Sequence, residues 1–91
     1  MILKLVQKYR RGQLTASHVA VQCLHMIDPM HPALVLEELP PAILKRMERF
    51  VTEYQQGKMV TNYGVLPAVD QVEAARVWIA SHPASLQDRD A

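Results

Sequence analysis

Apolar residues recur at helical spacing along most of this chain, and prolines and glycines separate the segments in which they do so. The clearest segment covers residues 41–56, where one stripe is formed by Ile43, Leu44, Met47, Phe50, Val51 and Tyr54. Charged residues occupy the opposite side, and Arg49 and Glu53 have the spacing of a helical ion pair. Gly57 follows where a helix commonly ends. The pattern predicts an amphipathic helix with one buried face.

Two earlier segments show the same period. Residues 2–11 combine an apolar side with a basic side, and Gly12 stands directly after them, as is typical just past a helix end. The next segment starts after Thr15, whose hydroxyl can accept a hydrogen bond from the first helical turn. It stops before Pro29, because a residue that precedes proline is forced out of the helical conformation. We therefore expect one helix on each side of Gly12.

Two more helices are expected in the second half of the chain. A short helix of two turns begins at Pro32, which suits the first helical position, and reaches Leu39. The last helix covers about 68–82, and its inner face is predicted from helical spacing to contain Val72, Ala75 and Ile79, with Trp78 at one edge.

The start of that last helix has two alternatives. Pro67 could occupy the first helical position, or Asp70 could cap the helix with Glu73 three residues later. The preceding residues, 58–67, lack a helical period and contain an Asn–Tyr–Gly turn signal, so we expect a loop there.

These segments predict an all-α fold, a small single-domain bundle of four to five helices joined by short loops. A chain of 91 residues, of which 49% are apolar, can form one modest core. We assign residues 1–82 to this helical domain. Residues 83–91 follow a proline and are mostly polar, so we expect a flexible C-terminal tail.

Composition excludes several classes of protein. The formal net charge is +1, which favours neither nucleic acid nor a membrane surface as a partner. No apolar run approaches the roughly 18 residues that a membrane-spanning helix needs. The single cysteine cannot form an internal disulfide, and we expect no signal peptide in the first residues, because Lys4 interrupts their short apolar run. We expect a cytoplasmic protein that does not bind membranes.

The stretch 17–32 crowds three of the four histidines around the single cysteine, which suggests a metal site or a catalytic Cys–His pair. On a helix, however, Cys23 and His25 point in nearly opposite directions, and His18 and His25 lie about 10 Å apart along the axis. Cys23 falls mid-helix on the apolar face, where a cysteine behaves as a small hydrophobic residue. We therefore expect no metal, no cofactor and no catalytic residue.

The first helix carries a basic stripe, formed by Lys4, Lys8, Arg10 and Arg11. Such a stripe could neutralise phosphates of a nucleic acid, and Lys45, Arg46 and Arg49 could extend it. Acidic residues interrupt this second group, and nucleic-acid-binding domains are usually more basic overall. A solvated helix face is the simpler interpretation of the stripe.

The region 30–47 is more apolar than one helix face requires. The residues that we predict to form a partner surface there are Met30, Leu34, Val35, Leu36, Leu39 and Met47. Either the short helix of this region is sandwiched inside the bundle, or one of its sides docks on another chain. Methionine side chains suit adaptable contacts of that kind.

The sequence thus favours a non-catalytic protein-interaction or regulatory module that binds another protein or a second copy of itself through this apolar surface. The alternative is a nucleic-acid-associated factor that uses the basic stripe. An enzyme is disfavoured, since no paired carboxylates, phosphate loop or nucleophile–base arrangement is visible.

Overall fold

A computed structural model describes residues 2–58 and 66–87 of the chain. This part contains five α-helices and one 3-10 helix: α1 (Ile2–Arg10), α2 (Ala16–Met26), α3 (Ala33–Leu36), α4 (Pro41–Gln55), α5 (Val69–Ser81) and η1 (Pro83–Leu86). The described residues include no strand, and the predicted all-α fold is confirmed.

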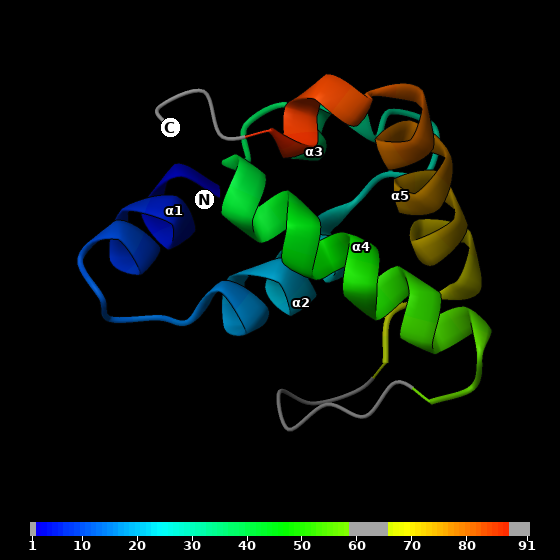
Figure 1. The fold of residues 1–91 in the computed structure, drawn as a ribbon, viewed down its shortest axis with the longest axis horizontal. Coiled ribbons are helices and arrows are strands. Elements are labelled where there is room, and N and C mark those ends of the chain that lie inside the picture. The colour runs from blue at the N-terminus through cyan, green and yellow to red at the C-terminus, as the bar shows by residue number, and fades with distance from the viewer. Residues whose placement is uncertain (1, 59–65, 88–91) are drawn as a thin grey trace.

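The central element of the bundle is α4 (Figure 1). It packs against α2, α5 and η1, whereas α1 packs against α2. In Figure 1, α1 and α5 lie on opposite sides of α4. Helices α2 and α4 lie at the centre because they carry most of the fully buried apolar side chains, which have to be covered by other helices.

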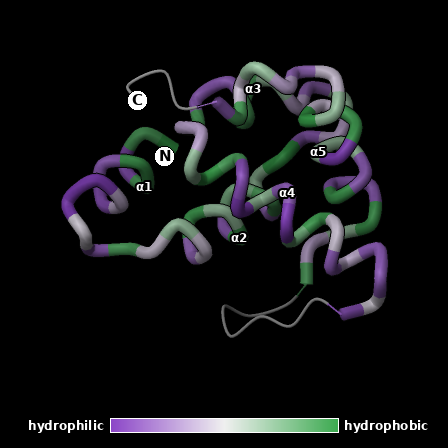
Figure 2. The backbone as a smooth tube through the Cα atoms, viewed as in Figure 1, coloured by the Kyte–Doolittle hydropathy of each residue, from purple (hydrophilic) through white to green (hydrophobic). Residues whose placement is uncertain are grey.

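The core forms where the apolar stripe of α4 meets the other helices. Ile43, Leu44, Met47 and Val51 are buried, while Phe50 and Tyr54 pack against the core at its edge. Hydrophobic and hydrophilic stretches alternate along α4 in Figure 2, as expected for a helix with one buried face. Burying such side chains stabilises the fold by about 1.5–3 kcal/mol each.

The ends of the longer helices follow from local sequence. The Thr15 hydroxyl accepts a hydrogen bond from the His18 backbone N–H at 3.1 Å, which confirms the predicted cap of α2. Gly12 has a positive φ of 76° and its N–H donates to the Tyr9 carbonyl at 3.0 Å, so glycine closes α1 without steric cost. Gly57, with φ 69°, ends α4 in the same way.

The helix predicted from Pro32 to Leu39 is shorter than expected. Regular α-helix is limited to α3, which is a single turn, and Pro32 precedes it as the N-cap residue. The backbone then continues through tighter turns, in which the N–H of Leu39 donates to the Leu36 carbonyl at 3.3 Å. The helix cannot extend further because Leu39 precedes Pro40.

Neither predicted start of α5 is correct. The N-cap position belongs to Ala68, whose N–H donates to the side-chain oxygen of Gln71 at 3.0 Å. Gln71 therefore has the capping role that one of the two alternatives gave to Asp70 and Glu73. Of the loop expected at 58–67, residues 59–65 lie outside the described part of the chain.

The segment assigned to a C-terminal tail, 83–91, is described as far as residue 87. Its first residues form η1, which packs against α4 and α5, and Leu86 contacts the core. The start of this segment is therefore part of the packed bundle, because Leu86 supplies an apolar anchor.

Candidate functional site

The structure divides the predicted partner surface into exposed and buried residues. Met30 and Leu34 are 80% and 71% exposed. The other members are buried in the core: Val35, Leu36, Leu39 and Met47. These four cannot form a docking surface in this fold, because the short helix α3 turns one side inward and Met47 lies on the inner stripe of α4. The remaining candidate, which we call the α3 surface, consists of Met30 and Leu34.

A tight turn positions the α3 surface. The side chain of Asp28 accepts the Met30 N–H at 2.9 Å, and its backbone carbonyl accepts the His31 N–H at 2.9 Å. The His31 carbonyl in turn accepts the Leu34 N–H at 3.2 Å. Asp28 thus shapes the chain between α2 and α3, a role typical of aspartate in turns.

The basic stripe lies on the exposed side of α1 and on Arg11, the residue that follows the helix. Lys4, Lys8, Arg10 and Arg11 are all exposed. None of these four side chains takes part in an ion pair within residues 2–58 and 66–87.

The structure places the cysteine of the histidine-rich stretch in the core. Cys23 is fully buried on the inner side of α2, as predicted, and desolvation raises the pKa of its thiol to about 11. A thiol with this pKa is almost entirely protonated near neutral pH, so it is a poor nucleophile. In the part of the chain that the structure describes, no three His, Cys, Asp or Glu side chains are close enough to hold a metal ion.

A groove of about 510 Å³ runs between α4 and α5. Val51 and Ile79 contribute buried apolar side chains to it, and charged residues form its rims. On one rim Arg49 pairs with Glu53 at 3.3 Å, which confirms the predicted helical spacing. The groove is amphipathic, with an apolar floor and charges of both signs above it.

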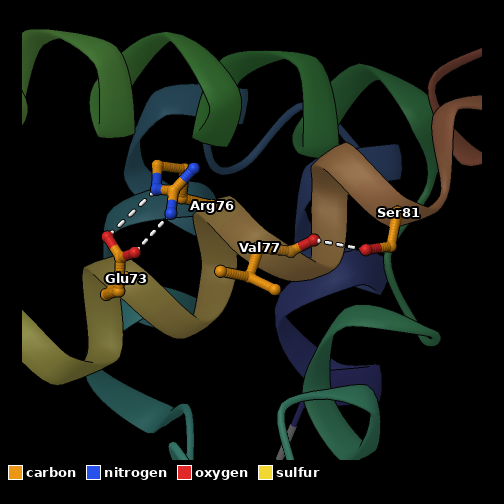
Figure 3. A network of polar contacts seen from close by, with 4 residues as sticks. All are labelled: Glu73, Arg76, Val77 and Ser81. Carbon is orange, nitrogen blue, oxygen red and sulfur yellow. Dashed lines mark hydrogen bonds and ion pairs between the residues drawn. The ribbon is translucent and has the colours of Figure 1, made fainter.

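The opposite rim is formed by Arg76, which reaches from α5 toward α4 (Figure 3). Its Nε donates to a Glu73 carboxylate oxygen at 3.0 Å, and its terminal nitrogen donates to the other oxygen. This hydrogen bond lowers the pKa of Glu73 and raises that of Arg76. The pair was not predicted, since Glu73 was considered only in one of the two alternative starts of α5, although the three-residue spacing of Glu73 and Arg76 is a recognisable signal.

A second groove, of about 470 Å³, lies between η1 and helices α3, α4 and α5. Its wall includes Trp78 and His82, whose rings stack with centroids 4.1 Å apart and planes inclined by 9°. The Nδ1 atom of His82 lies 2.8 Å from the Trp78 carbonyl oxygen, a distance that fits a hydrogen bond donated by a protonated Nδ1. This groove was not predicted, because it depends on the packing of η1.

A third groove, of about 400 Å³, lies where α2 begins beside α4. We call it the α2–α4 groove; its lining residues are Ala16, Ala42, Lys45, Arg46 and Arg49. All of its ionisable side chains are cationic, in contrast to the mixed charge of the α4–α5 groove.

Comparison with known proteins assigns no relative to the chain. No protein-family model matches it, and neither curated proteins nor solved structures include a significant match. Across residues 2–58 and 66–87, no helix is both long and apolar enough to cross a membrane.

Proposed function

We propose that the chain is a non-catalytic interaction module that binds another protein, a second copy of itself included, through the α3 surface. The observation that carries the proposal is the exposure of Met30 and Leu34 to 80% and 71% on a segment whose neighbouring apolar residues are buried. Burying these two side chains in an interface stabilises the complex by about 1.5–3 kcal/mol each, which favours association.

The size of this surface limits the strength of binding. Stable protein interfaces bury roughly 800 Å² on each partner, far more than two side chains supply. The partner therefore has to contact surrounding polar residues as well, and Met30 and Leu34 act as its apolar anchors. We expect a weak or transient association, and place it in the cytoplasm.

Light scattering coupled to size-exclusion chromatography tests self-association over a range of concentrations, because a weak dimer populates by mass action. The variant Met30→Lys/Leu34→Lys is expected to remain monomeric where the unmodified chain dimerises. A matched control is Leu3→Lys on α1, since Leu3 is 65% exposed and lies outside the α3 surface.

A partner other than a second copy is tested by affinity capture with the same three proteins. A partner that the unmodified chain and Leu3→Lys retain, and that Met30→Lys/Leu34→Lys loses, supports the proposal. A monomeric chain that retains no such partner contradicts it.

A second candidate function is a nucleic-acid-associated factor that uses the basic stripe. The observation that favours it is the exposure of all four stripe cations, none of which is paired within the described residues. An electrophoretic mobility shift of a nucleic acid that the unmodified chain causes at low salt, and that Lys4→Glu/Lys8→Glu/Arg11→Glu does not cause, would support this function. Absence of binding at low salt would exclude it.

A further inference from the structure

The α2–α4 groove concentrates positive charge that the α3 surface does not use. Lys45 and its neighbour Arg46 line the groove from one turn of α4, and Arg49 lines it from the next turn. Lys45 and Arg49 are exposed, whereas Arg46 is half-buried, so packing restricts its position. No acidic side chain lines the groove.

The facing wall adds to this positive potential. It is formed by Ala16, the first residue of α2, which is an 11-residue helix. Thr15 accepts the His18 N–H, while the earlier N–H groups of a first turn have no acceptor inside the helix. The positive end of the α2 dipole therefore lies on the same side as the three cations.

Negative charge limits how far the positive region extends along α4. Glu48 is the neighbour of Arg49 in sequence, and Glu53 lies one turn further on and pairs with Arg49 at 3.3 Å. A long polyanion that followed α4 would meet both carboxylates. The charge pattern therefore suits a short, compact anion better than an extended nucleic acid.

We propose that the α2–α4 groove binds a small ligand that carries one or two phosphate groups. The guanidinium groups of Arg46 and Arg49 donate paired hydrogen bonds to phosphate oxygens, and Lys45 contributes a point charge. A ligand phosphate would compete with Glu53 for Arg49, an exposed pair that costs little to break. The groove volume of about 400 Å³ lies within the usual range for small-molecule sites.

Titration with inorganic phosphate and pyrophosphate, followed by backbone amide NMR shifts, tests the proposal. Sodium chloride at matched ionic strength is the reference for non-specific screening. We expect saturable shifts at Ala16 and along residues 42–49, with pyrophosphate binding more tightly than phosphate because it carries more charge.

The test variant is Lys45→Gln/Arg46→Gln/Arg49→Gln, and we expect it to weaken pyrophosphate binding by about tenfold or more. The control Lys4→Gln/Lys8→Gln/Arg11→Gln removes the same charge from α1 and is expected to change binding less than about twofold. If Arg46→Gln disturbs folding, Lys45→Gln/Arg49→Gln alters only exposed positions and is expected to weaken binding as well.

Three results would overturn the proposal: shifts no larger than those caused by chloride, equal losses in the groove variant and the α1 control, or saturable shifts that map elsewhere. If a single-stranded oligonucleotide binds through the groove and pyrophosphate does not, the proposal is wrong about the ligand, and the groove binds a nucleic acid. The groove shares no residue with the α3 surface, so this experiment is independent of the proposed function.

Discussion

The side-chain amide of Gln71 donates a hydrogen bond to the backbone carbonyl of His25 at 2.9 Å, across 46 positions of sequence. The same nitrogen donates to the Ile27 carbonyl at 3.1 Å, and the side-chain oxygen accepts the Ala68 N–H. One side chain therefore satisfies two carbonyls at the C-terminal end of α2, that of the cap residue Ile27 included, and the N–H of the residue that caps α5. Backbone groups at helix ends need such partners when they are partly buried.

Replacing Gln71 by alanine is expected to lower the free energy of unfolding by about 1–3 kcal/mol, since these backbone groups lose their partner. Urea denaturation measures the change. Gln55→Ala is the matched control, because Gln55 is exposed on α4, and we expect a change of less than about 0.5 kcal/mol there. Equal midpoints for the two variants would contradict the role assigned to Gln71.

The two leucines of α3 are expected to respond differently to the same substitution. Leu36 is fully buried, so Leu36→Ala leaves a cavity and is expected to cost about 2–5 kcal/mol. Leu34 is exposed, so Leu34→Ala is expected to change stability by less than about 0.5 kcal/mol. Thermal or urea unfolding compares them, and a similar cost at both positions would mean that α3 is not oriented as described.

The stability of the fold is expected to fall in alkali through Cys23. Its folded pKa is raised from 9.0 to about 11, so between these values the unfolded chain binds fewer protons than the folded chain. The free energy of unfolding therefore decreases as pH rises through this window, by about 2 kcal/mol for this group. Well below pH 9 both states keep the proton and the contribution is constant.

Cys23→Ala provides the measurement. The stability difference between the unmodified chain and this variant is expected to shrink from pH 8 to about pH 11, while lysine and tyrosine titrations affect both proteins alike. A difference that stays constant with pH would contradict the burial of the thiol.

Trp78 is the only tryptophan, and the stacked ring of His82 covers one of its faces. His82→Ala is expected to expose the indole, which shifts its fluorescence emission to longer wavelength and increases quenching by acrylamide. His82→Phe keeps a stacking ring and is expected to leave the emission close to that of the unmodified chain. Identical spectra for all three proteins would contradict the stacking.

Local sequence was sufficient for most helix boundaries. The α4 stripe, the Thr15 cap and the glycines after α1 and α4 are all confirmed, because periodicity and capping act over one or two turns. The inward position of Cys23 followed from the same periodicity. These features need no information about distant parts of the chain.

The start of α5 shows where local sequence was insufficient. Local sequence allowed two starts, with Pro67 at the first helical position or with Asp70 as the cap, yet Gln71 caps the helix because its amide also reaches a carbonyl of α2. That advantage exists only after α2 and α5 have packed. The position of Leu86 and η1 also depends on tertiary packing, because η1 contacts α4 and α5.

The candidate surfaces, like the helix ends, were predicted only in part from local sequence. Sequence alone determined the all-α class and the charge of each helix, because both depend on residue type and short-range spacing. Only the tertiary structure decided that Val35, Leu36, Leu39 and Met47 are core while Met30 and Leu34 are surface. It also brought the three cations of α4 beside the first residue of α2. An apolar or charged side chain acquires its role from what packs beside it, and helices distant in sequence supply those neighbours.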